Sequence, residues 1–122
     1  MLKVTSAPAE EPVSLAEAKA HLKVDYSADD DYITALITAA RQQAEEYTNL
    51  ALIDTTYEQA FDGFPATTRL NPYQSLVLWR SPLISVTSVV YTAEDGTSIT
   101  EDAANYKVDT YRRPPSVSPV YG

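Results

Sequence analysis

The chain has 122 residues, of which 44% are hydrophobic and 21% are charged, so its composition is that of one globular domain rather than a disordered segment. Nine basic and 17 acidic residues give a net charge of −8. Because nucleic-acid binders place Lys and Arg against phosphates, this balance argues against tight DNA binding. The lack of cysteine excludes disulfides and thiol chemistry, and no apolar run reaches the about 20 residues of a membrane span.

The N-terminal part predicts an extended segment followed by a short helix. Residues 1–13 contain Pro8 and Pro12, which lack amide donors, and they show no alternation typical of a strand. Ser14 and Glu17 then have the spacing of a capping box, in which each side chain accepts a hydrogen bond from the other residue's amide. We therefore expect a short helix that begins immediately after this serine.

A second, longer helix is predicted by the clearest period in the sequence. Ser27 or Asp29 is the expected N-cap, and Asn49 is expected to take the left-handed conformation at the C-terminal end. Between these ends, apolar side chains recur at steps of three and four residues, namely Ile33, Leu36, Ile37, Ala40, Ala44 and Tyr47. This period predicts an amphipathic helix of about five turns. Glu45 and Glu46, late in this helix, are interpreted as a solvated face.

The second half of the chain predicts strands. Residues 55–61 are β-prone, residues 76–79 form a short apolar run, and residues 84–92 are the strand candidate richest in β-branched side chains. Residues 94–97, which include an Asp-Gly pair, predict a hairpin turn. Residues 106–109 predict a further strand.

Together these elements predict an α+β fold with two N-terminal helices, one of them long and amphipathic, followed by a small antiparallel β-sheet. Three parts are expected: an extended N-terminal segment over residues 1–13, one domain over residues 14–109, and a Pro-rich C-terminal segment over residues 110–122. Within the domain, residues 14–49 hold the helices and residues 55–109 form the β-rich part. The prolines of the last segment are expected to hinder regular structure there.

The inventory of reactive side chains argues against most catalytic sites. His21 is the only histidine, and three glycines leave no phosphate-binding loop. The aspartates of residues 25–31 lack the glycine and glutamate of a calcium loop and are interpreted as helix-cap residues. No catalytic residue, metal ligand or cofactor is therefore predicted. Two alternatives stay open, a small carboxylate-based hydrolase and a monomeric peptide-binding adaptor domain.

A small predicted core and nine tyrosines favour a protein that buries the rest of its apolar surface by forming an oligomer. The tyrosine ring buries apolar area while its hydroxyl stays hydrogen-bonded, and Trp and Arg are enriched among interface hot spots. The candidate contact residues are Trp79, Arg80, Tyr91, Tyr111, Arg112 and Arg113. Trp79 also suits a second role, as a core anchor of the sheet.

Several segments, taken in order, resemble one known family. Residues 14–25, Ser-Leu-Ala-Glu-Ala-Lys-Ala-His-Leu-Lys-Val-Asp, are similar to the opening of the head–tail connector (adaptor, or head completion) proteins of long-tailed bacteriophages. An acidic stretch and an apolar-rich helix follow, as they do in the family. Residues 81–91, the Asp95–Gly96 pair and residues 106–109 also keep the family's order and spacing. At residues 48–50, Thr-Asn-Leu stands where relatives have Thr-Gly-Arg, so no contact of that arginine is carried over.

The resemblance implies a structural virion protein that has no catalytic activity and no cofactor. Connector subunits form an oligomeric ring, typically twelve-fold, which docks beneath the portal protein. A stopper or tail-completion protein attaches below, and the genome leaves through the central channel without specific binding. The implied location is the viral neck between capsid and tail, reached from the host cytoplasm during virion assembly, with no membrane involved. A net charge of −8 repeated around a ring predicts a lumen that repels DNA.

Overall fold

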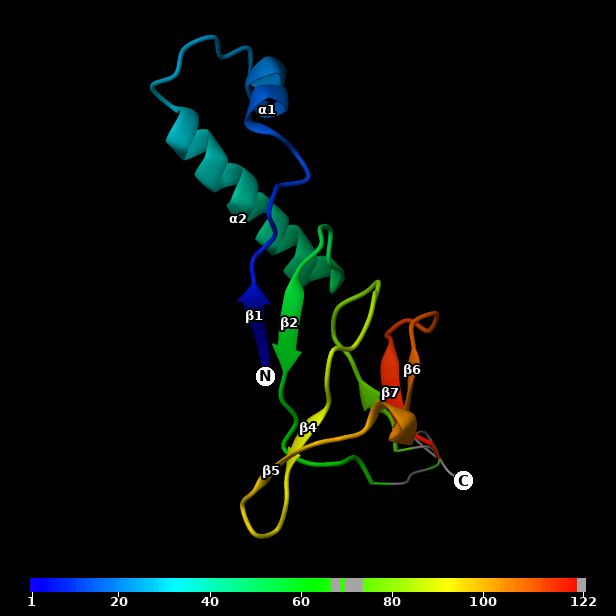
Figure 1. Ribbon diagram of the computed structural model, residues 1–122. Helices are drawn as coiled ribbons and strands as arrows, with labels where there is room; N and C mark the ends of the chain where they lie inside the picture. The colour runs from blue at the N-terminus through cyan, green and yellow to red at the C-terminus, as the bar shows by residue number, and fades with distance from the viewer. Residues whose placement is uncertain (67–68, 70–73, 121–122) are drawn as a thin grey trace. The chain divides into compact units, whose positions relative to one another are not determined.

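The chain divides into two compact units, which are described separately in this computed structural model (Figure 1). The helical unit is Leu2–Gln59, and the β unit is Ala60–Gly122 together with Met1. The structure describes residues 1–66, 69 and 74–120. Within that part of the chain, no helix combines the length and the hydropathy needed to cross a bilayer.

Helix α1 (Leu15–Leu22) begins as the sequence predicts. The Ser14 hydroxyl accepts a hydrogen bond from the Glu17 amide at 3.2 Å, and the Glu17 carboxylate accepts one from the Ser14 amide at 2.8 Å. Hydrogen bonds from the Ser14 amide and then from its hydroxyl hold the pKa of Glu17 below its ordinary value. The capping box is therefore confirmed. The helix ends at Lys23, which takes the left-handed conformation with φ 58°.

Replacing Ser14 with Ala should speed hydrogen exchange in the first turn of α1 by about fivefold, because the Glu17 amide loses its acceptor. No residue of α1 is fully buried, so packing cannot conceal the loss. Amide exchange followed by NMR measures the effect. Ser85→Ala, at an exposed residue outside regular structure, serves as the matched control. Equal exchange rates in the two variants would contradict a stabilising role for the cap.

Helix α2 (Asp30–Thr48) is the long helix that the apolar period predicts. Of the two expected N-caps, Asp29 holds the position, although its side chain makes no capping hydrogen bond. Asn49 takes the left-handed conformation with φ 57°, as expected for a residue that replaces glycine there. Lys19 of α1 pairs with Asp30 at 2.5 Å and so joins the first helix to the start of the second.

A strand precedes both helices, which the sequence does not predict. Strand β1 (Leu2–Ser6) pairs antiparallel with β2 (Thr56–Gln59), and Figure 1 shows the two side by side. Pro8 and Pro12 lie beyond the strand, so they remove none of its hydrogen bonds. The partner strand lies on the far side of both helices in the sequence, where no local pattern reveals it. The prediction that the helices open the fold is therefore wrong.

The β unit contains two separate small sheets in place of one. Its elements in chain order are β3 (Leu76–Val77), β4 (Val90–Thr92), β5 (Ser98–Thr100), a 3₁₀ turn η1 (Ala103–Asn105), β6 (Tyr106–Asp109) and β7 (Ser116–Pro119). Strands β3, β7 and β6 form an antiparallel sheet in that order, and β4 pairs only with β5. With the β1–β2 pair, the described chain has three small sheets, so the prediction of a single sheet is wrong.

The C-terminal segment supplies the central strand of the three-stranded sheet. The sequence predicts that its prolines hinder regular structure, yet β7 pairs with β3 on one side and with β6 on the other. Pro114 and Pro115 precede this strand, and Pro119 is its last residue, so the missing amides interrupt little of the ladder. Residues 121–122 of this segment lie outside the described residues.

The hairpin turn between β4 and β5 is confirmed. Gly96 has φ +85°, which side-chain-bearing residues rarely adopt, and the Asp95 carboxylate accepts from the Thr97 amide at 2.9 Å and from its hydroxyl at 2.6 Å. These hydrogen bonds hold the pKa of Asp95 below its ordinary value. The strand before the turn is shorter than predicted, because residues 83–89 form no ladder.

Candidate functional site

The chain exposes more surface than a compact protein of its mass. Its accessible surface is 9328 Å². A compact 13.4 kDa body exposes about 6,500 Å², and two separate compact bodies of half that mass expose about 7,800 Å² together. Among the described residues, the buried aliphatic side chains are Ile33, in the helical unit, and Val117, in the β unit. Much apolar surface therefore stays open to contact other molecules.

Helix α2 carries an exposed, uncharged and mostly apolar stripe beside its buried face. Its members lie within about 80° of arc and extend over about 22 Å at 1.5 Å per residue. We call this surface the α2 stripe; it consists of Tyr32, Leu36, Ala40, Gln43 and Tyr47. The two tyrosines at its ends are 66% and 92% exposed. No member is charged, and the exposed carboxylate of Glu46 lies along one edge near the C-terminal end of the helix.

The loop between β6 and β7 presents three of the predicted contact residues. We call Tyr111, Arg112 and Arg113 the β6–β7 tip; all three are exposed, and Tyr111 is 97% exposed. The Asp109 carboxylate accepts hydrogen bonds from the amides of Tyr111 and Arg112, each at 3.0 Å. After the tip, Pro115 is fully buried, and its carbonyl accepts from the Leu78 amide at 2.8 Å. The tip is thus anchored at both ends.

The other predicted contact residues lie elsewhere in the β unit. Trp79 and Arg80 follow β3, where Trp79 is half exposed and Arg80 is half-buried. Tyr91 lies in β4, and its ring meets the ring of Phe64 edge-on, with centroids 5.9 Å apart and an interplanar angle of 67°. Tyr91 lines a cavity to which neither Trp79, Arg80 nor the tip contributes. The six candidates therefore do not form one site. They lie in three places, namely after β3, in β4 and at the β6–β7 tip.

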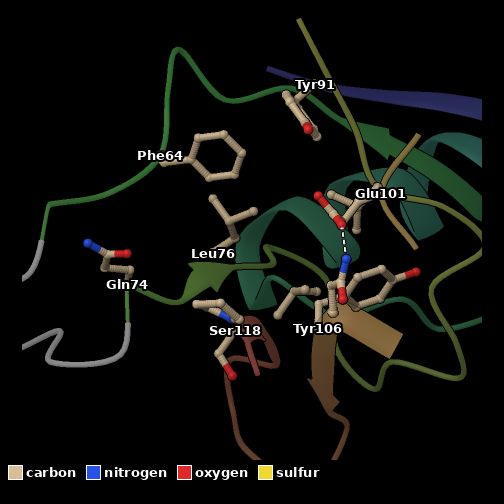
Figure 2. Close-up of a pocket in the computed structure, with 11 residues that line it drawn as sticks. Phe64, Gln74, Leu76, Tyr91, Glu101, Tyr106 and Ser118 are labelled. Carbon is tan, nitrogen blue, oxygen red and sulfur yellow. Dashed lines mark hydrogen bonds between the residues drawn. The ribbon is translucent and has the colours of Figure 1, made fainter. Parts of the chain in front are cut away.

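The cavity beside Tyr91 has a volume of about 340 Å³ and is mostly apolar (Figure 2). Phe64, Leu76 and Tyr91 contribute to its lining, and Glu101 is the only carboxylate among the described residues that line it. The dashed line in Figure 2 marks the hydrogen bond from the Asn105 amide group to Glu101 at 2.6 Å. A carboxylate-based hydrolase needs two converging acids, which this cavity does not supply. Within the described part of the chain, no three His, Asp or Glu residues are grouped to hold a metal ion.

A buried ion network in the helical unit is absent from the sequence-based predictions. Arg41 donates from Nε to Glu11 Oε2 at 2.6 Å and from Nη1 to Glu45 Oε2 at 2.7 Å. Glu11 also accepts from the Thr38 hydroxyl, and Glu45 from the Leu52 amide, both at 2.9 Å. The side chains of Arg41 and Glu45 are only 8% and 5% exposed. The network therefore ties the extended N-terminal segment and the segment after α2 to the helix between them.

The interpretation of Glu45 and Glu46 as a solvated pair is half wrong, because Glu45 is buried while Glu46 is exposed. One signal for this was available, since Arg41 and Glu45 have the i,i+4 spacing of a helical ion pair. The third member, Glu11, lies 30 residues before Arg41 in an extended segment. No local pattern connects that residue to the helix.

The network predicts an acid-sensitive contribution to stability. The hydrogen bond from Arg41 holds the pKa of Glu11 below its ordinary value of 4.5, against the smaller opposing effect of burial. A carboxyl whose pKa is lower in the folded state stabilises above its unfolded pKa, and this stabilisation is lost as pH falls through the folded pKa. At pH values below about 4.5, we expect the urea concentration at the unfolding midpoint to decrease as the pH is lowered. The decrease should be less steep in Glu11→Gln. Glu10→Gln, at the exposed neighbouring residue, should keep the wild-type profile; identical profiles for all three proteins would refute the assignment.

Comparison with known proteins identifies the family. Residues 12–76, just over half of the chain, match the family model described as phage gp6-like head-tail connector protein. This region includes α1, α2 and β2 and ends at the first residue of β3. No curated protein matches the chain, and no solved structure matches it. The family match confirms the resemblance seen in the sequence, and the chain therefore belongs to the phage gp6-like head–tail connector proteins, a family of structural virion components.

Proposed function

We propose that copies of this protein assemble into a homo-oligomeric ring that joins the capsid portal to the tail and encloses the DNA exit channel. The observation that carries the proposal is the large exposed surface, with apolar side chains on both units. Such surface is unfavourable in water and is covered when neighbouring copies and adjoining layers pack against it. A closed ring needs two unlike patches that meet across each boundary, and the two units differ in structure, since one contains both α-helices and the other contains mostly strands.

The distribution of charge supports a channel that lets DNA pass without binding it specifically. The helical unit has four basic and 11 acidic residues, a net charge of −7, while the β unit has five basic and six acidic residues, a net charge of −1. Carboxylates lining the lumen would repel phosphates along the whole channel. In this proposal the ring is twelve-fold and non-enzymatic. It lies in the virion neck between the portal and a stopper or tail-completion protein, after assembly in the host cytoplasm.

Mixing the purified chain with its cognate portal tests this function directly. Native mass spectrometry of the complex should give one mass with the same number of connector copies on every portal. A complex with a single copy per portal, or no complex, would overturn the proposal and favour a monomeric adaptor. Cryo-electron microscopy of the same sample tests the channel. A lumen lined by Arg69, Arg80, Arg112 and Arg113 would reject an acidic, repulsive lining.

A further inference from the structure

The β6–β7 tip combines exposed side chains with an anchored backbone. Its three side chains have no polar partner among the described residues, while its backbone is fixed by the Asp109 carboxylate. Because the backbone of the loop is already anchored, the entropy lost on binding is mainly that of the three side chains. Tyr and Arg are also the side chains that most often dominate interface energies. An exposed group of one phenol and two guanidiniums on an anchored backbone is therefore suited to an acidic, partly apolar partner.

The C-terminal end of helix α2 has these properties. Tyr47 is 92% exposed at the end of the uncharged α2 stripe, and Glu46 is exposed beside it. The last turn of α2 contains no basic residue. The negative end of the helix dipole is thus left without a compensating cation, and a cation placed there is stabilised by both the dipole and the carboxylate. The surrounding unit, with its net charge of −7, attracts a basic group over a longer range.

We propose that the β6–β7 tip of one copy docks on the C-terminal end of helix α2 of the neighbouring copy. Arg112 and Arg113 face Glu46 and the last carbonyls of the helix, and Tyr111 packs against the α2 stripe. The occupant is a second copy because the same chain carries both complementary surfaces, which is what a head-to-tail ring contact requires. This inference rests on the proposed ring function and assigns residues to its subunit boundary.

Charge reversal and charge exchange test this contact. The wild type and four variants are mixed with the cognate portal, and the copies bound per portal are measured by native mass spectrometry. Arg112→Glu/Arg113→Glu and Glu46→Lys should each weaken ring formation by at least about tenfold, because like charges then face each other. The combined variant, with all three substitutions, should recover most of the loss. Lys23→Glu/Lys107→Glu changes the net charge by the same amount as the double arginine reversal, at exposed residues outside the proposed contact. This control should assemble like the wild type.

The outcomes separate this contact from the ring itself. If the wild type forms a ring and the reversals leave it intact, the contact is refuted while the proposed function stands. If the charge-reversal variants do not form a ring and the combined variant does not restore it, the tip binds something other than α2, and the contact is again refuted. Retardation of duplex DNA by the wild type and not by Arg112→Glu/Arg113→Glu would identify that partner as nucleic acid. If the wild type forms no ring on the portal, the proposed function fails, and the contact fails with it. A cooperative urea transition in every variant establishes that it folds. Only small shifts of the midpoint are expected, upward for Glu46→Lys at the C-terminal end of α2 and downward for the variant that replaces Lys23 at the end of α1.

Discussion

Arg41→Ala should lower the free energy of unfolding by about 3 kcal/mol, the largest loss expected from any single substitution in the helical unit. The substitution leaves Glu45 buried at 5% exposure without its cation, and it removes two hydrogen bonds from Glu11. Breaking a buried ion pair by removing one member costs about 3–5 kcal/mol. The lower end applies because Glu11 is still 23% exposed and can be partly hydrated. Urea denaturation followed by far-ultraviolet circular dichroism measures the loss.

Two further variants establish that the effect comes from uncompensated charge. Gln42→Ala, at the exposed neighbouring position of α2, should change stability by less than about 0.5 kcal/mol. Adding Glu11→Gln and Glu45→Gln to Arg41→Ala should recover part of the loss, because neutral amides are less costly to bury than unpaired carboxylates. A loss below about 0.5 kcal/mol for Arg41→Ala itself would mean that the network does not stabilise the fold.

Ile33→Ala should cost about 2–3 kcal/mol, the second largest effect, because Ile33 is 6% exposed and is the buried aliphatic side chain described for the helical unit. A thin core can partly collapse around the missing atoms, which places the value near the lower end of the range for large-to-small substitutions. The same urea titration, carried out on the monomer without portal, measures it.

Leu36→Ala is the matched control on the same helix. Leu36 is 49% exposed on the α2 stripe, so its truncation removes less buried area and should cost less than about 1 kcal/mol in the monomer. Ile33→Ala and Leu36→Ala remove side chains of similar size. The difference between their losses in free energy of unfolding therefore distinguishes the buried face of α2 from its exposed stripe. Similar losses for both would mean that the two faces are wrongly assigned.

The elements that the sequence predicts correctly are those fixed by neighbouring residues. The capping box of Ser14 and Glu17 lies within one helical turn, and Asn49 ends α2 through its own backbone conformation. Strands β1 and β7 depend instead on partners far along the chain, so neither alternation nor proline content predicts them. Gly96 with its neighbouring aspartate is again local, and that hairpin is where the sequence predicts it.

The candidate site follows the same rule. Tyr111, Arg112 and Arg113 are predictable as contact residues from their side-chain types alone. Their anchoring by Asp109 and by buried Pro115 depends on the β6–β7 pairing, which the sequence does not reveal. Glu45 shows the converse, since a residue type that is usually solvated is buried because Arg41 and the Leu52 amide supply its partners.

In the proposed ring, the scarcity of buried aliphatic side chains among the described residues would link the folding of one subunit to the presence of its neighbours. A subunit whose apolar groups contact water until other copies arrive gains part of its stability from mass action, since anything that binds only the folded form shifts the folding equilibrium. Dilution of the proposed ring would therefore weaken each protomer as well as the assembly. A sequence change that loosens one boundary of that ring would then lower the free energy of unfolding by at most the binding free energy it removes.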